Sequence, residues 1–135
     1  MINPIEHSRT KDAAQKYKVE PYVIPADVYG AENLSGRGGW TWYTGSSSWY
    51  YIAGIQYILG LNINDNVLSL NPGIPRSWKE DIIRYKYEKS IYNIHVINNN
   101  SKNSGITRIL IDGKETENRI KLDESGKIYN VEAEM

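Results

Sequence analysis

The spacing of apolar and polar residues divides the chain into a first half with helical patterns and a second half of strands. In the first half, Ser8 or Thr10 is a suitable N-cap for a helix that runs to about Tyr17. Pro21 and Pro25 interrupt the segment that follows, so no long regular element is expected between them.

A second helix is predicted from Trp49 to Leu59, with Ser46–Ser48 as N-cap candidates and Gly60 just beyond its C-terminal end. Its sequence is apolar on almost every side, which is typical of a helix that is buried all round. The first half offers one other helix, which is too little to surround it. This helix therefore needs neighbours that the pattern does not supply.

The second half alternates between apolar and polar positions, with turn residues at regular intervals. Asp112-Gly113 is a strong hairpin signal, and the strands before and after it are expected to form a meander. Five or six short strands with this spacing indicate a β-sandwich or half of one. The predicted strands are Val67–Leu70, Asp81–Tyr87, Ser90–Ile97, Ile106–Ile111, Glu115–Leu122 and Lys127–Glu134.

Composition excludes several functional classes. The 135 residues contain 16 Lys and Arg against 16 Asp and Glu, so the basic surplus of a nucleic-acid-binding protein is missing. There is no Cys, which excludes disulfides, thiolate metal sites and a Cys nucleophile. The apolar stretch Trp49–Leu61 is too short to span a bilayer, and no secretory signal is visible, so the cytoplasm is the expected compartment.

The glycine-rich segment Gly36–Gly45 is the most informative local feature. It leads into the predicted second helix, and the free N–H groups and positive dipole end of a helix N-terminus attract anions. Thr44 adds a hydroxyl donor and Gly45 permits close approach of the backbone, although the Gly-Lys-[Ser/Thr] ending of a P-loop is absent. The alternative is a loop that makes a tight packing turn, with the following serines acting only as caps.

Other candidate groups give weaker signals. The Trp and Tyr residues around the loop suit either sugar stacking or burial in a core, and burial is the better interpretation for the Trp49 helix. Glu20, Asp27 and Glu32 lie near the loop, and a suitably separated carboxylate pair could act on a glycosidic bond. Neither His7 nor His95 has a partner at metal-ligand spacing, so no metal site is predicted.

Two motifs together resemble a known family. They are Tyr17–Val23 (Tyr-Lys-Val-Glu-Pro-Tyr-Val) and Gly36–Ser46 (Gly-Arg-Gly-Gly-Trp-Thr-Trp-Tyr-Thr-Gly-Ser), followed by Asn71–Pro75 (Asn-Pro-Gly-Ile-Pro). The pattern is similar to the C-terminal end of glycoside hydrolase family 94, the inverting glycoside phosphorylases, and within it to the cyclic β-1,2-glucan synthase and 1,2-β-oligoglucan phosphorylase branch. The resemblance covers essentially the whole chain.

The resemblance implies an α+β chain in two parts. Residues 1–61 would be the last helices of an (α/α)₆ catalytic barrel, and residues 62–135 a C-terminal antiparallel β-sandwich. The family cleaves a β-glucoside with inorganic phosphate, giving α-glucose 1-phosphate, and needs no metal or organic cofactor. Its general acid, a single Asp, lies upstream of the matched region, so this chain alone is expected to hold no catalytic residue and to be inactive.

The resemblance also implies site residues. Thr44 and Gly45 match the family's phosphate-binding pair, and Arg37, Trp40 and Trp42 are candidates for lining the sugar or phosphate subsites. The expected partners are a β-glucoside and phosphate, together with the missing part of the barrel supplied in trans or a second copy of the chain. No nucleic acid or membrane partner is expected. The alternative function is a non-catalytic carbohydrate-binding β-sandwich module.

Overall fold

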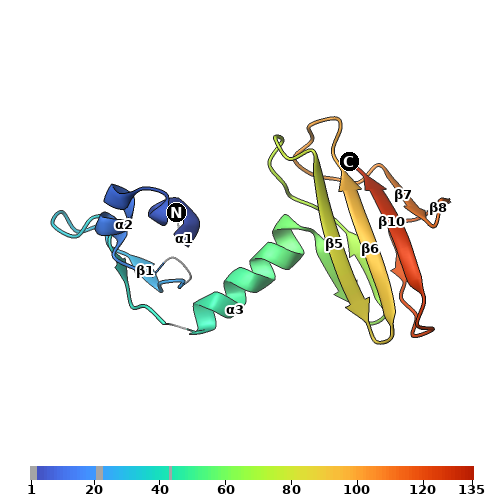
Figure 1. Ribbon diagram of the computed structural model, residues 1–135, viewed down its shortest axis with the longest axis horizontal. Coiled ribbons are helices and arrows are strands. Elements are labelled where there is room, and N and C mark those ends of the chain that lie inside the picture. The colour runs from blue at the N-terminus through green and yellow to red at the C-terminus, as the bar shows by residue number, and fades with distance from the viewer. Residues whose placement is uncertain (1–2, 21–22, 43) are drawn as a thin grey trace. The chain divides into compact units, whose positions relative to one another are not determined.

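The protein is described by a computed structural model that covers residues 3–20, 23–42 and 44–135 (Figure 1). The chain is of the α+β class and divides into two compact units, Met1–Tyr51 and Ile52–Met135. We call these the N-terminal unit and the C-terminal unit, and each is described by itself.

The N-terminal unit combines short helices with a small hairpin. The side chain of Asn3 accepts a hydrogen bond from the Ile5 amide at the first helix, and Thr10 accepts one from the Ala13 amide at the second. Such caps satisfy amides that a helix leaves without partners. The elements are α1 (Pro4–Ser8), α2 (Lys11–Tyr17), β1 (Asp27–Val28), β2 (Gly38–Gly39) and α3 (Thr44–Ile52).

The predicted first helix is confirmed as α2, with Thr10 as its cap. The second helix begins earlier than predicted, because α3 starts at Thr44 and the serines Ser46–Ser48 lie inside it rather than capping it. It then continues as a π-helical segment, η1 (Ala53–Ile58), where the Leu59 amide donates to the Gly54 carbonyl at 2.9 Å. Gly60 follows with φ of 72°, as the C-terminal glycine signal predicts.

The C-terminal unit contains two β-sheets. One has five strands in the order β5-β6-β10-β7-β8, and the other has three in the order β3-β4-β9. The strands are β3 (Leu61–Asn64), β4 (Val67–Leu70), β5 (Glu80–Tyr87), β6 (Ser90–Ile97), β7 (Arg108–Ile111), β8 (Lys114–Thr116), β9 (Ile120–Lys121) and β10 (Ile128–Glu134).

The predicted meander is wrong in its last part. Strand β10 lies between β6 and β7, parallel to β6 and antiparallel to β7, so the last strand of the chain completes the middle of the larger sheet (Figure 1). The single strand predicted over Glu115–Leu122 is two short strands in different sheets. Asn118 lies between them, and its side chain bonds both the amide and the carbonyl of Leu70 at 2.8 and 2.6 Å. These bonds hold the crossing from one sheet to the other.

Both sheets contribute to one buried core in the C-terminal unit. The alternation in β6 buries every second residue, as a strand with one face on a core requires. The smaller sheet adds Leu68 and Leu70 from β4, which are 0% and 1% exposed. The core residues of the two sheets are Leu61, Leu68, Leu70, Tyr92, Ile94, Val96, Ile109, Ile120, Val131 and Ala133.

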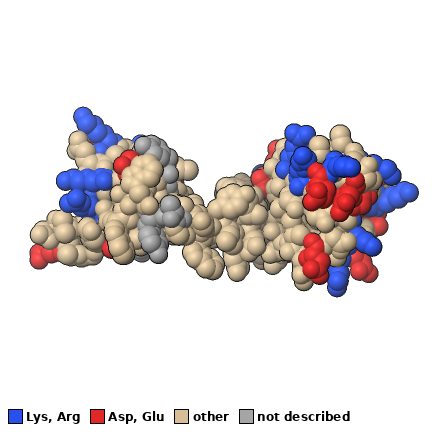
Figure 2. Space-filling model, turned by 90° about the horizontal axis from the view of Figure 1, so that it is seen from below, with Lys and Arg blue, Asp and Glu red and all other residues tan. Residues whose placement is uncertain are grey.

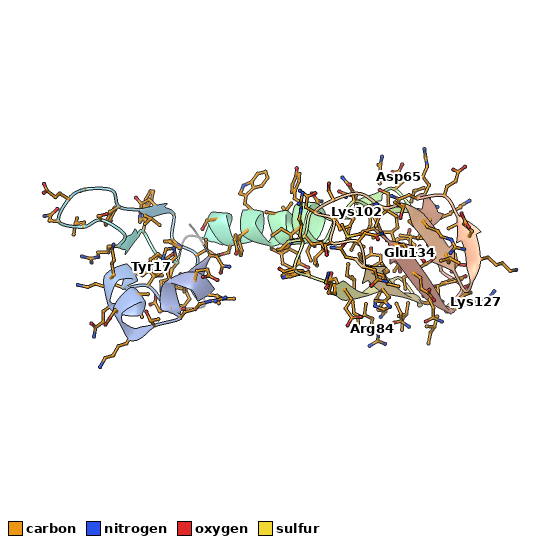
Figure 3. The ribbon with its side chains drawn as sticks, turned by 90° about the horizontal axis from the view of Figure 1, so that it is seen from above. Tyr17, Asp65, Arg84, Lys102, Lys127 and Glu134 are labelled. Carbon is orange, nitrogen blue, oxygen red and sulfur yellow. The ribbon has the colours of Figure 1, made fainter. Side chains whose placement is uncertain are left out.

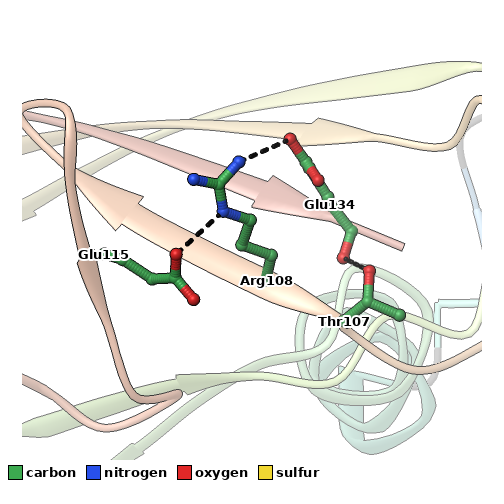
Figure 4. Close-up of polar contacts among 4 residues, drawn as sticks. All are labelled: Thr107, Arg108, Glu115 and Glu134. Atoms are coloured by element: carbon green, nitrogen blue, oxygen red, sulfur yellow. Dashed lines mark hydrogen bonds and ion pairs between the residues drawn. The ribbon is translucent and has the colours of Figure 1, made fainter.

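Charged residues link the strands at the far edge of the larger sheet (Figure 4). Arg108 on β7 bonds Glu115 on β8 at 3.1 Å and lies 3.8 Å from Glu134 on β10. Thr107 donates from its hydroxyl to the Glu134 carbonyl at 3.0 Å. Exposed ion pairs of this kind contribute about 0–1 kcal/mol each, so they add little to the stability of the sheet.

The expected burial of the second helix is not found within this chain. Trp49, Tyr51 and Tyr57 are 73%, 70% and 74% exposed, and among the described residues η1 contains none that is buried. Large aromatic side chains gain most from leaving water, so exposure of three of them on one helix is unusual for a packed domain. In the part of the chain that the structure describes, no helix has the length and apolar character needed to cross a bilayer.

Candidate functional site

The centre of the N-terminal unit is Tyr17, the last residue of α2 (Figure 3). Its side chain is 1% exposed and stacks on His7 of α1, with ring centroids 4.1 Å apart. Its hydroxyl has no hydrogen-bond partner among the described residues, and burial raises the pKa of Tyr17. The next residue, Lys18, takes a left-handed conformation with φ of 55° and ends the helix by donating its amide to the Ala14 carbonyl.

Gly38 and Gly39 form β2 and pair with β1 in an antiparallel register. Both are buried. A Cβ at Gly38 would collide with Cγ2 of Val19, and one at Gly39 would collide with the Tyr29 hydroxyl. Close packing therefore requires glycine here, and for these two positions the tight-packing interpretation of the glycine-rich segment is the correct one.

Trp40 and Trp42 follow β2 and both have left-handed backbone conformations, with φ of 53° and 66°. This region is unfavourable for bulky side chains by about 1–2 kcal/mol per residue. The two indoles are nevertheless 75% and 66% exposed, and Nε1 of Trp42 donates to Glu20 at 3.4 Å. Strained residues that are held outward against water are characteristic of binding sites rather than of a core.

The first turn of α3 comes directly after this aromatic segment. Thr44 and Gly45 are the first two residues of the helix, and Ser46 donates from its hydroxyl to the Ile24 carbonyl at 3.4 Å. In a helix that begins at Thr44, the amides of the first turn point out of the helix end and carry the positive end of its dipole. Tyr43 and the side chain of Thr44 lie outside the described residues.

Arg37 lies apart from these groups, at the end of the β1–β2 connection. It lines a groove of about 220 Å³ together with Lys16 and Lys18 of the α2 terminus. The described lining of that groove contains neither Trp40 nor Trp42. The structure thus brings Arg37 together with two lysines that sequence reasoning did not single out, because their proximity depends on the hairpin folding back on α2.

The other predicted groups are distributed as follows. Asp27 lies on β1 and Glu32 in the exposed β1–β2 connection, while Glu20 contacts Trp42. Across the residues that the structure describes, no group of three His, Cys, Asp or Glu side chains could hold a metal ion. His95 bonds Glu80 at 2.9 Å on neighbouring strands of the C-terminal unit.

A second groove lies in the C-terminal unit, beside the β3–β4 turn. Its volume is about 350 Å³. Asp65, at this turn, has a left-handed conformation with φ of 55° and is labelled in Figure 3. The polar side chains along this groove have no hydrogen bond among those found between described residues. The lining residues are Asn64, Asp65, Val67, Ser69 and Arg119.

Comparison with known proteins identifies relatives for most of the chain. Residues 1–60 match the family model described as the glycosyl hydrolase 94 superfamily, catalytic domain. The cyclic beta-(1,2)-glucan synthase NdvB of Rhizobium meliloti is 49% identical over 78 residues, which cover 58% of this chain and 3% of that protein.

Two phosphorylases align over a longer stretch. Solabiose phosphorylase of Paenibacillus borealis is 31% identical over 114 residues, covering 84% of this chain and 14% of that protein. N,N'-diacetylchitobiose phosphorylase of Vibrio furnissii is 29% identical over 114 residues, with the same coverage of 84% and 14%. The chain therefore spans no more than about a seventh of the length of these relatives. Together these matches show that the chain belongs to the glycosyl hydrolase 94 superfamily, with residues 1–60 corresponding to part of its catalytic domain.

Proposed function

We propose that the chain is the C-terminal part of an inverting glycoside phosphorylase that converts a β-glucoside and phosphate into α-glucose 1-phosphate. Membership of the superfamily and the likeness to several phosphorylases support this proposal. In this account residues 1–61 are the last helices of an (α/α)₆ barrel, and residues 62–135 are the C-terminal β-sandwich. Inorganic phosphate is a co-substrate, and no other cofactor takes part.

The observation that carries the proposal is the start of α3 at Thr44. In the proposed site the amides of the first turn and the Thr44 hydroxyl donate to phosphate, while Gly45 lets the anion approach the backbone. An anion at this position is favoured both by the outward-pointing N–H groups of a first turn and by the helix dipole. Phosphate binding at Thr44 and Gly45 is the function we assign to the turn.

The strained aromatic pair Trp40 and Trp42 lies just before this turn, exposed to water. We assign these indoles to stacking on a glucose ring, and Arg37 to the outer part of the substrate-binding surface. A β-1,2-linked glucan is the proposed substrate, since the relative with 49% identity is a cyclic beta-(1,2)-glucan synthase.

Catalysis requires a general acid on the side of the glycosidic bond opposite the phosphate. In our proposal the remainder of the catalytic domain supplies it. The exposed Trp49 and Tyr51 of α3 then form the interface with the binding partner. This partner is either a separate polypeptide that carries the rest of the catalytic domain or a second copy of this chain.

A carbohydrate-binding module is the second candidate function. The groove beside Asp65 favours it, because it gathers amide, carboxylate, hydroxyl and guanidinium groups of the kind that bind sugar hydroxyls. The match of residues 1–60 to a catalytic domain weighs against it. If this groove alone accounts for sugar binding, Arg119→Ala abolishes binding of gluco-oligosaccharides and Trp42→Ala leaves it unchanged.

The test is an assay of α-glucose 1-phosphate released from β-1,2-gluco-oligosaccharides and phosphate. One sample contains this chain alone, and the other also contains the product of the gene immediately upstream. We expect release only in the second sample. Release by the chain alone would disprove the assignment of the general acid to another polypeptide.

A further inference from the structure

Of the residues that line the groove formed by α2 and the β1–β2 connection, the proposed phosphorylase site uses only Arg37. The groove holds about 220 Å³ and lies wholly within the N-terminal unit. One wall is the C-terminal end of α2 and the other is the connection between the two strands. Its lining residues are Gln15, Lys16, Lys18, Asn33, Leu34, Ser35 and Arg37.

Charge is strongly segregated at this groove. The N-terminal unit has five basic residues and five acidic ones, and three of the basic residues line the groove while none of the acidic ones does. A fourth basic residue, Arg9, is paired with Glu6 at 2.8 Å. No ion pair joins Lys16, Lys18 or Arg37 to a described carboxylate. Figure 2 shows Lys and Arg side chains gathered at one side of this unit.

The walls of the groove are held by backbone hydrogen bonds. In the connection, the Leu34 amide donates to Ala31 and the Arg37 amide donates to Leu34, each at 2.9 Å, which makes two successive turns. Gly36 has φ of 85°, and a Cβ there would come within 2.5 Å of Cε of Lys16. The lysine stem thus lies directly over this glycine, beside the connection that carries Arg37.

We propose that this groove binds a small phosphate-bearing ligand, either inorganic phosphate or the phosphate group of a sugar phosphate. A guanidinium can form two parallel hydrogen bonds to phosphate oxygens, and two ammonium groups add charge without a fixed direction. Gln15, Asn33 and Ser35 supply neutral donors and acceptors for the hydroxyls of an attached sugar. Three cations are too few for a nucleic-acid-binding surface. The chain also has a net charge of zero, so it lacks the basic surplus that such binding needs.

A simpler explanation covers only part of the observation. Lysines often follow the C-terminal end of a helix because they interact favourably with its carbonyl groups. That accounts for Lys16 and Lys18, but Arg37 comes from a separate element and lines the same groove without an ion pair to a described carboxylate. The inference rests on the lining of this groove and does not depend on the phosphate site proposed at the α3 turn.

The test is a titration of the full ¹⁵N-labelled chain followed by NMR, using inorganic phosphate, α-glucose 1-phosphate and, as a neutral control, glucose. We expect both phosphates, but not glucose, to shift the amide signals of residues 15–18 and 33–37. Lys16→Gln and Arg37→Gln should each weaken binding about threefold, and the double variant about tenfold, because exposed charge pairs are individually weak. Lys11→Gln is the matched control, since Lys11 lies on α2 but outside the groove.

Three results would overturn the inference. They are shifts unchanged in the double variant, shifts reproduced by an equal concentration of chloride, and an equal loss of affinity in Lys11→Gln. The Thr44→Val variant separates this site from the proposed catalytic one. Binding that persists in Thr44→Val and disappears in Lys16→Gln/Arg37→Gln supports the groove whatever the outcome of the phosphorylase assay.

Discussion

The hydroxyl of Tyr129 donates a hydrogen bond to Oδ2 of Asp123, six residues earlier in the chain. The Tyr129 ring also stacks on Tyr92 of β6, with centroids 4.9 Å apart. The other carboxylate oxygen accepts from the Ser90 hydroxyl at 2.9 Å and from Ser125. Asp123 thus ties the turn before β10 to the strand beside it. These donors, Tyr129 first among them, lower the pKa of Asp123 well below its usual range.

The first prediction concerns acid stability. A carboxyl whose pKa is lowered by folding stabilises the protein above its unfolded pKa of about 3.9, and this stabilisation is lost as pH falls toward the folded value. Asp123→Asn should therefore lower the urea midpoint at pH 7, and the difference from wild type should shrink below about pH 4. Asp81→Asn is the control, since no hydrogen bond of the Asp81 side chain is found among the described residues. If the urea midpoints of wild type and Asp123→Asn differ by the same amount from pH 7 to pH 3, the lowered pKa of Asp123 does not contribute to stability.

The second prediction contrasts two tyrosines. The buried Tyr17 hydroxyl has no partner among the described residues, so Tyr17→Phe removes a polar group without breaking a hydrogen bond. We expect the stability of the isolated chain to stay the same or rise. Tyr129→Phe breaks the bond to Asp123 and should lower the unfolding free energy. Urea unfolding of both variants decides the point, and an equal loss in the two would show that Tyr17 has a partner.

The third prediction concerns the packing of β2. Gly38→Ala puts a methyl group against Val19, and overpacking of this kind costs about 1–3 kcal/mol. Gly30→Ala is the matched control, because a Cβ at that position would meet no described residue within 4 Å apart from its chain neighbours. The readout is exchange of the Tyr29 amide, which bonds the Arg37 carbonyl across the hairpin. Faster exchange should occur in Gly38→Ala alone, and similar rates in the two variants would mean that Gly38 packs differently.

Much of the strand pattern could be predicted from sequence because period-two alternation is a local property. Strand β4 and strand β6 have the bounds predicted for them, and β5 differs by one residue. The pairing could not be predicted, since alternation does not say which strand lies beside which. Strand β10 joins the middle of the sheet beside β6. Asn118 lies where the chain crosses between the sheets, and it bonds Leu70, which is 48 residues away in the sequence.

The candidate site was predictable only in its local part. Helix caps and glycine signals lie within a few residues of the structures they specify, so Thr10 and Gly60 were identified correctly. The groove of Lys16, Lys18 and Arg37 could not be predicted, because these residues come together only when the β1–β2 hairpin forms. The start of α3 was set too late, since three serines resemble a cap while the helix had already begun at Thr44.

The fourth prediction concerns the exposed helix. Trp49, Tyr51 and Tyr57 lie in water, so little packing protects the amides of α3 and η1. Hydrogen exchange of the monomer should be fast over residues 49–59 and slow in β6 and β10, whose side chains form the core. Addition of the upstream gene product should slow exchange at residues 49–59. Strong protection there in the monomer would contradict the proposed interface.

The most direct test of the central claim is the rate of phosphorolysis in the complemented mixture as a function of phosphate concentration. Thr44→Val removes the hydroxyl that we assign to phosphate, whereas Ser47→Ala, in the same helical turn, is the matched control. We expect kcat/KM for phosphate to fall at least about tenfold in Thr44→Val, the usual effect of losing a hydrogen bond to a charged group, and to change little in Ser47→Ala. Equal rates in Thr44→Val and wild type would contradict the assignment of the α3 turn to phosphate.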